Sequence, residues 1–216
     1  ALTPSFCPVL SVIAFPASLG LAAISRPLVT VLYGEKYLPA IPVLCVLGLL
    51  GYGRALLLPA EQYFAAAERQ DLMVKGMVYA GIVNIFLASA LIPMYGAIGA
   101  ALCNGVSQIG AMCICWWLLQ RNMRLVQISI QPVLRTLAAG LAMAVTVLPA
   151  AVLLAPLPGL LCGLFIGLVS YPLYLRGTKA LMPEDRERFN TLSRKLPRPA
   201  RALVSTLVWV LFPVEK

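Results

Sequence analysis

Six long apolar runs constrain the fold of this chain more than any other feature. A helix that crosses a bilayer needs about 20 apolar residues at about 1.5 Å each. The segments of suitable length are about 5–33, 39–66, 72–92, 97–119, 133–154 and 158–175. They are apolar on every side, whereas strands of a membrane barrel alternate in character. We therefore predict an all-α, polytopic transmembrane helix bundle with about six spanning helices.

The connections between these runs divide into two kinds. Three are short and contain proline or glycine, at 34–37, 93–96 and 155–158, and these residues break helices. Thirteen lysines and arginines lie in or next to the connections that alternate with them and in residues 176–201, whereas the first side has Lys36 alone. Cytoplasmic loops carry the excess of basic residues. We therefore predict a cytoplasmic C-terminus, and we interpret the net charge of +9 as a topology signal rather than as nucleic-acid binding.

The segment 181–216 differs from the rest of the chain. Pro183, Glu184 and Asp185 favour the start of a charged helix, because proline and acidic residues suit a first turn. Residues 202–212 form an apolar run that is too short to span, so we expect it to lie at the membrane interface. We divide the chain into 1–122, a helical membrane unit, 123–180, a final helix pair, and 181–216, a basic cytoplasmic tail.

Few residues suit catalysis or metal binding. The chain has no histidine and eight carboxylates, half of which lie in the tail. The six cysteines lie in apolar segments, and Cys113 and Cys115 lack the spacing of a structural zinc site. We predict no catalytic residue, no metal site and no cofactor.

One arginine and one glutamate lie inside the run 39–66. Arg54 and Glu61 are seven residues apart, which places them on one helix face about 10 Å apart along the axis. Pro59 between them frees the carbonyl of Ala55 and is expected to kink the helix. An arginine at membrane depth faces the bundle interior or water. Two interpretations stay open: a structural partner on another helix, or a place in the wall of a cavity.

Uncharged polar residues mark two further runs. Asn104, Ser107 and Gln108 share one helix face, and Asn84 lies in the middle of its run. Their side chains would either form hydrogen bonds between helices or line the wall of a water-filled cavity. Gly159, Gly163 and Gly167 recur at spacing four, which predicts close packing of helices within the chain.

An ordered set of motifs runs through two successive stretches of the sequence. They are PLVTVLYGEKYLPAIPVLCVLGLL and AAERQDLMVKGMVYAGIVNIFLASALIPMYGAIGAALCNGVSQ. The set reads apolar-Tyr-Gly-acid-base-Tyr, Glu-Arg-Gln, Asn-Ile and Ile-Pro-x-Tyr-Gly-x-x-Gly-Ala-Ala, and it covers about residues 17–122. It resembles the polysaccharide biosynthesis flippases, which include the O-antigen and lipid-linked oligosaccharide flippases, of the multidrug/oligosaccharidyl-lipid/polysaccharide exporter superfamily. The tail element LMPEDRERF is similar to the C-terminal segment of that family.

The resemblance implies a fourteen-helix fold, with two six-helix lobes around a cavity and a C-terminal helix pair. Residues 1–122 then correspond to the last four helices of the second lobe, and 123–180 to the final pair. The first lobe lies outside this sequence, so we expect the chain to be an incomplete transporter that does not act alone.

The implied function is translocation of a polyprenyl-pyrophosphate-linked oligosaccharide across the bacterial inner membrane by alternating access, for cell-surface polysaccharide assembly. The implied partners are that lipid-linked oligosaccharide, membrane lipids and the first lobe. Cationic groups would bind the pyrophosphate, which makes Arg54 the first candidate, and Glu61 would hold Arg54 between cargo visits or bind a coupling cation. Asn84, Asn104 and Gln108 complete the candidate cavity residues.

Three alternatives remain. A multidrug or cation antiporter of the same fold would favour intramembrane carboxylates, and Glu61 is one such case, although it lies beside Arg54. A membrane glycosyltransferase or polymerase would carry acid, base or metal-binding residues in large loops, whereas the outer loops hold only Glu35 and no histidine. The third alternative is a non-transporting remnant.

Overall fold

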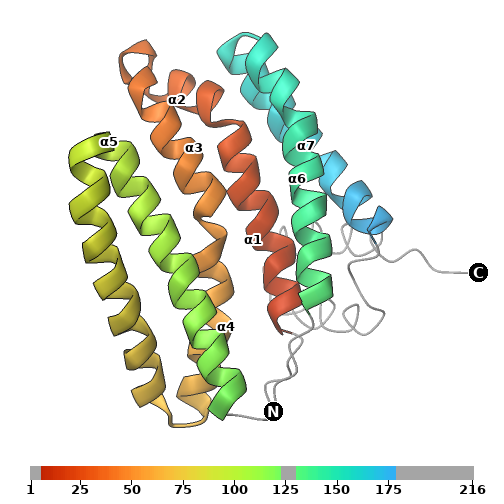
Figure 1. Ribbon diagram of the computed structural model, residues 1–216. Coiled ribbons are helices and arrows are strands. Elements are labelled where there is room, and N and C mark those ends of the chain that lie inside the picture. The colour runs from red at the N-terminus through yellow and green to blue at the C-terminus, as the bar shows by residue number, and fades with distance from the viewer. Residues whose placement is uncertain (1–5, 123–129, 179–216) are drawn as a thin grey trace, which may run out of the picture.

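The computed structural model describes residues 6–122 and 130–178, and within these ranges every regular element is a helix. Figure 1 shows them as a bundle of long helices. Their bounds are α1 Phe6–Ala23, α2 Ser25–Tyr33, the 3₁₀ helix η1 Glu35–Ala40, α3 Ile41–Leu50, α4 Tyr52–Ala66, α5 Gln70–Asn122, α6 Ile130–Leu153 and α7 Pro156–Gly177. The predicted all-α class is confirmed, while the expectations for the tail concern residues outside the described ranges.

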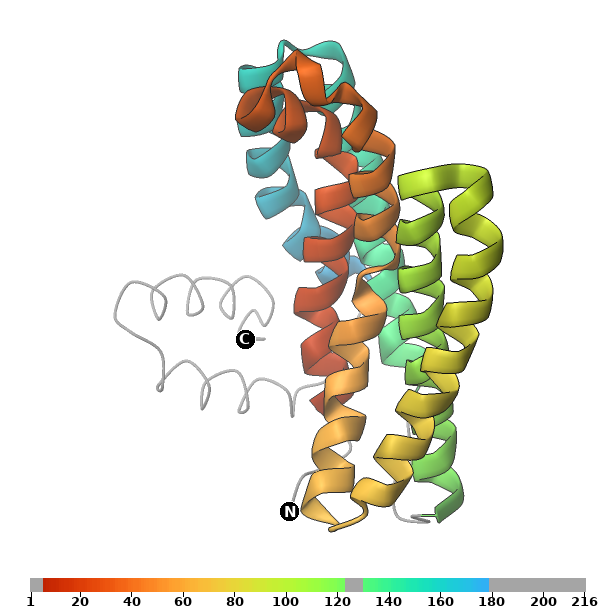
Figure 2. The ribbon, with the colours of Figure 1, turned by 90° about the vertical axis from the view of Figure 1, so that its left-hand side faces the viewer.

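The described helices are long and apolar enough to cross a membrane. Four stretches meet that criterion by themselves, Glu35–Ala66, Gln70–Asn122, Gln131–Leu153 and Pro156–Gly177, and the bent pair of α1 and α2 makes a fifth. The 53-residue α5 turns back on itself at Gly96, which has φ 55° and ψ −127°. Figures 1 and 2 show its two arms, 70–95 and 97–122, side by side. Each arm exceeds the length of about 20 residues that a spanning helix needs. The predicted turn at 93–96 is therefore confirmed.

Two spans are interrupted. The first bends by 67° between α1 and α2, just before Pro27, which cannot donate a hydrogen bond to the carbonyl of Ala23. The second is interrupted at Gly51, between α3 and α4. Helix α4 continues through Pro59 and the interruption lies eight residues earlier, so the kink expected at Pro59 stays a prediction.

Helix α1 lies between the two parts of the bundle. It contributes to one core cluster with α6 and α7 and to another with α4, while α4 and α5 form a third. On one side a Cβ at Gly48 of α3 would lie 2.7 Å from the backbone nitrogen of Ala22. On the other side the Tyr171 hydroxyl donates to the carbonyl of Val12 at 2.7 Å.

The glycine series of α7 packs within the chain, as its spacing predicts. A Cβ on Gly163 would lie 3.2 Å from Ile24 Cγ2, and one on Gly159 would lie 3.0 Å from the carbonyl oxygen of Ala150. A Cβ on Gly167 would meet Val147 at 3.6 Å. These contacts join α7 to α6 and to the bend of the first span.

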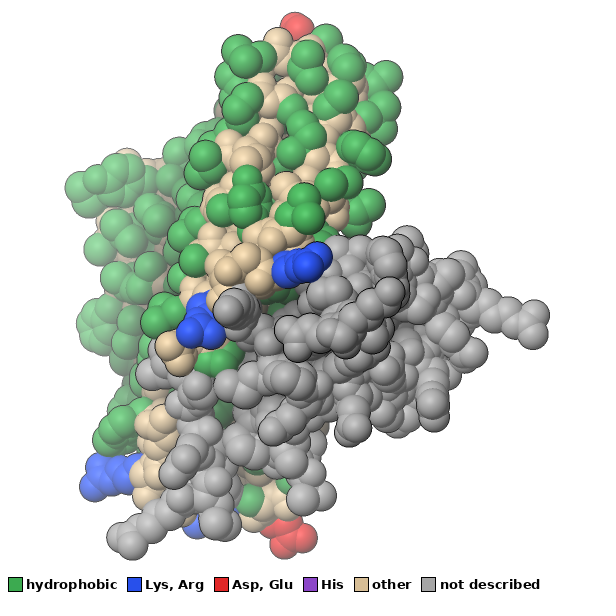
Figure 3. All heavy atoms as spheres, turned by 90° about the vertical axis from the view of Figure 1, so that its right-hand side faces the viewer, with side chains coloured by type: hydrophobic (Ala, Val, Ile, Leu, Met, Phe, Trp, Pro, Cys, Tyr) green, Lys and Arg blue, Asp and Glu red, His purple; other side chains and the backbone are tan. Residues whose placement is uncertain are grey.

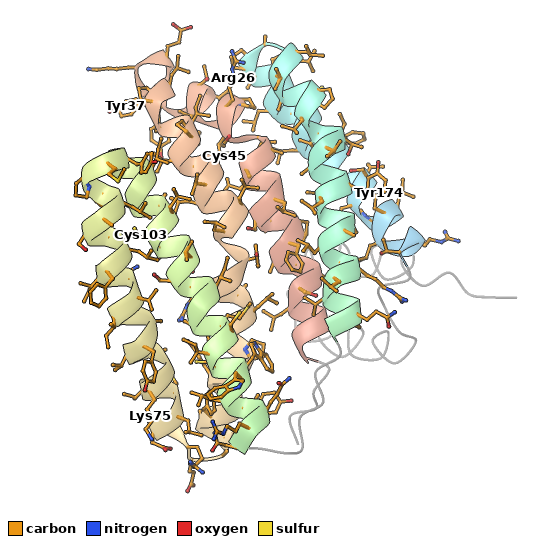
Figure 4. The ribbon with its side chains drawn as sticks, in the orientation of Figure 1. Arg26, Tyr37, Cys45, Lys75, Cys103 and Tyr174 are labelled. Atoms are coloured by element: carbon orange, nitrogen blue, oxygen red, sulfur yellow. The ribbon has the colours of Figure 1, made fainter. Side chains whose placement is uncertain are left out.

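The residues around Tyr37 and those around Lys75 lie at opposite ends of the bundle. Figure 4 places Arg26 and Tyr37 at one end and Lys75 at the other. On the face in Figure 3, hydrophobic side chains cover the upper part of the described surface, and the visible Lys and Arg side chains lie below it. The sequence-based charge count assigned Arg26 to neither side, and the structure places it with the residues next to Lys36.

Candidate functional site

The candidate site begins at the break between α3 and α4. Gly53 lies against the second arm of α5, where a Cβ would be 2.9 Å from Ile109 Cγ1 and 3.1 Å from its backbone nitrogen. No larger residue fits there without movement, so the backbones approach closely on that side. Arg54 follows on an uncovered face, with 53% of its side chain exposed.

Arg54 and Glu61 form an ion pair along α4. Arg54 Nη1 donates to Glu61 Oε1 at 2.7 Å, and the Glu61 side chain is only 11% exposed. The shared face predicted from their spacing is confirmed, and the structural partner expected on another helix is found on the same helix. At 1.5 Å per residue, Arg54 lies about 18 Å and Glu61 about 8 Å from the end of α4 at Ala66. The pair therefore extends from membrane depth toward the Lys75 end.

Packed residues support the opposite side of α4. Ala60 and Phe64 are fully buried in a cluster that includes Cys115 and Leu119 of α5. The indole nitrogen of Trp116 donates to the carbonyl of Leu56 at 3.0 Å. This bond ties α5 to α4 within one turn of Pro59, so the ion pair is carried on a helix whose position is fixed from behind.

Asn84 has a different environment from Arg54. Its side-chain amide donates to the Cys103 carbonyl at 3.3 Å and to Ser107 Oγ at 3.0 Å, which joins the two arms of α5. Asn84 was expected either to form hydrogen bonds between helices or to line a cavity, and the structure shows the hydrogen bonds. Its role in a cavity wall stays a prediction.

The predicted polar face of the second arm is divided. Ser107 is buried beneath Asn84, whereas Gln108 Nε2 donates to Asn104 Oδ1 at 2.7 Å on a more exposed side. The backbone of Gln108 also lies next to Gly53, the residue before Arg54. The Asn104–Gln108 pair is therefore carried by the part of α5 that packs beside the Arg54 site.

Two contributions were missed by the sequence reasoning. Arg26 lies at the start of α2, and the signal for it is the triplet Ser25-Arg26-Pro27, which suits a helix start inside an apolar run. Trp116 is the second, because its bond to Leu56 joins two helices and no local pattern predicts that partner. Its neighbour Trp117 is 54% exposed and has the Arg121 guanidinium 5.2 Å from its ring centre, as suits the interface.

The described residues contain no group of three or more His, Cys, Asp or Glu side chains that could hold a metal ion. The chemistry available at the site is therefore that of an exposed guanidinium, its mostly buried carboxylate partner and nearby amides. Such a set binds anionic oxygens and hydroxyl groups.

Comparison with known proteins gives two matches. The family profile described as "Lipid II flippase MurJ" matches residues 2–162. The "Teichuronic acid biosynthesis protein TuaB" of Bacillus subtilis (strain 168) is 38% identical over 63 residues, which is 29% of this chain and 13% of that protein. The match thus spans a small part of this curated relative. No solved structure matches.

Proposed function

Because the chain belongs to the lipid II flippase MurJ family, we propose that it forms part of a transporter that moves a polyprenyl-pyrophosphate-linked oligosaccharide across the membrane. The observation that carries this proposal is the Arg54–Glu61 pair, which places a half-exposed guanidinium well inside an apolar span. The flippase resemblance drawn from the sequence motifs and the family match agree on the type of transporter.

Arg54 supplies the chemistry that a pyrophosphate requires. Its planar fork of N–H donors matches anionic oxygens in pairs, and at low dielectric such charge-assisted bonds are strong. Glu61 holds the guanidinium while the site is empty and yields it to the cargo. The Asn104–Gln108 amides would hydrogen-bond hydroxyls of the sugar head, and Asn84 would line the adjoining wall.

The remaining proposals concern the whole transporter. Residues 1–122 form the last four helices of a second lobe, 123–180 the final pair and 181–216 a cytoplasmic tail. Alternating access then results from rocking of this lobe against a first lobe around the Arg54 site. The protein works in the bacterial inner membrane without catalysing a reaction. The role in teichuronic acid biosynthesis that the name of TuaB states supports a saccharide cargo for cell-surface assembly.

A cation antiporter is the main competing function, because Glu61 is an intramembrane carboxylate. The direct bond from Arg54 opposes it, since a carboxylate neutralised by a guanidinium is a poor cation site.

Substitution of Arg54 in the natural full-length protein tests the proposal. Arg54→Ala and Arg54→Lys are expressed in a flippase-deficient strain, membrane levels are measured, and polysaccharide export is compared with wild type. We expect normal insertion, export reduced at least tenfold in Arg54→Ala, and partial export in Arg54→Lys. Arg69→Ala is the control, because Arg69 pairs with Asp71 at an exposed helix end. Wild-type export from a normally inserted Arg54→Ala protein would refute the cargo role, and lost insertion would assign Arg54 a structural role.

A further inference from the structure

Glu61 is a mostly buried carboxylate that depends on Arg54 for its counter-charge. Its only ion pair in the described part of the chain is the 2.7 Å contact with Arg54 Nη1. The adjoining α1 and α3 contain no charged residue, and Glu61 acts electrostatically on the Cys115 thiol of α5. The charged residues of α5 lie in its first two turns and its last turn, at Asp71, Lys75 and Arg121.

An anionic cargo at Arg54 competes with Glu61 for the same guanidinium. The Arg54 side chain is half-exposed and Glu61 is not, so the arginine is the partner that reorients toward a ligand. A carboxylate left without its counter-charge in a poorly hydrated site is costly, and such groups are neutralised by binding a proton.

We propose that cargo binding at Arg54 is coupled to the uptake of one proton by Glu61, so that this carboxylate is the proton-binding site of the transporter. The inference rests on the proposed function of Arg54. One O–H bond forms when the ionised carboxylate takes a proton from the aqueous phase. The same bond breaks when the cargo leaves and Arg54 returns. No other reactant takes part.

The coupling has a definite sign. Because the liganded state binds more protons than the empty state, the affinity for a pyrophosphate rises as the pH falls. Uptake of one full proton changes the dissociation constant by about tenfold per pH unit, beyond any change that arises from protonation of the ligand itself. Glu61→Gln has no carboxylate to protonate and no strong hold on Arg54, so it should bind more tightly at high pH and lose this part of the pH dependence.

Calorimetry on the purified full-length protein in lipid nanodiscs tests the coupling, with geranyl pyrophosphate as the probe. Titrations at one pH in two buffers of different protonation enthalpy give the protons taken up per ligand bound. The difference between wild type and Glu61→Gln cancels the protonation of the probe, and we expect it to approach one proton. Glu68→Gln, which removes an exposed carboxylate just beyond the same helix, should match wild type.

The outcomes separate the two proposals. Equal proton uptake in wild type and Glu61→Gln, with binding abolished by Arg54→Ala, overturns the coupling and leaves the cargo role of Arg54 standing. Equal binding by wild type and Arg54→Ala overturns both. A difference of about one proton together with loss of binding in Arg54→Ala establishes the exchange.

Discussion

At the scale of single residues, Gly76 decides how closely the two arms of α5 can approach. A Cβ on Gly76 would lie 2.6 Å from Cys115 Sγ, and Cys115 has no exposed surface. Gly81, on the same arm, has no atom within 4 Å of its Cβ position. We predict that Gly76→Val lowers the free energy of unfolding by about 1–3 kcal/mol through overpacking, whereas Gly81→Val has little effect.

Thermal unfolding in detergent micelles measures this difference between the two glycines. Cys115→Ala in the Gly76→Val protein removes the sulfur atom and should recover part of the loss. Equal destabilisation by the two valine substitutions would show that the arms are not in the contact described for Gly76.

At the candidate site, the sequence predicts which residues share a helix face but not which side chains bond to one another. The shared face of Arg54 and Glu61 follows from helix geometry alone. Their direct bond depends on the conformations of both side chains and on which neighbours cover that face, and neither follows from the spacing. The contacts of Asn84 required the register between the two arms of α5, which no local pattern specifies.

At the scale of elements, the polar contacts between the arms of α5 can be tested against a matched asparagine. Asn84→Ala removes two hydrogen bonds that join the arms, whereas Asn104→Ala removes one bond within a single helix. Hydrogen bonds between membrane helices contribute about 0.6 kcal/mol each, with a maximum of about 1.7 kcal/mol. We predict a loss of about 1 kcal/mol for Asn84→Ala and a smaller loss for Asn104→Ala, by thermal unfolding. A larger loss in Asn104→Ala would contradict this assignment.

The helices themselves were largely predictable, while their interruptions were not. Apolar runs of spanning length and turns such as 93–96 follow from local sequence. Proline alone does not locate a break, because Pro16, Pro59, Pro149 and Pro172 all lie inside continuous helices. In a membrane bundle neighbouring groups can compensate for a disturbed backbone, so the position of a break depends on tertiary contacts.

At the scale of the whole molecule, Tyr37 and Lys75 lie at opposite ends of the bundle, and the excess of basic residues in the connections on the Lys75 side predicts the topology. In a cysteine-free background, a cysteine at Tyr37 should react with an impermeant thiol reagent added outside intact cells. Cysteines at Gln70 and Asn190 should react only after permeabilisation, because the connection at Gln70 and the sequence around Asn190 belong to the basic, cytoplasmic side of the charge count. Labelling of position 70 or 190 from outside would contradict the predicted orientation in the membrane.

We propose that the whole transporter moves a pyrophosphate-linked saccharide and that Arg54 contacts the pyrophosphate. The most direct measurement uses the full-length protein in proteoliposomes, where a saccharide-hydrolysing enzyme added outside reports how much lipid-linked oligosaccharide reaches the outer leaflet. We expect movement by wild type and Arg69→Ala, and a rate at least tenfold lower for Arg54→Ala. Unchanged movement in Arg54→Ala, or absence of movement in wild type while a cationic dye is transported, would contradict it.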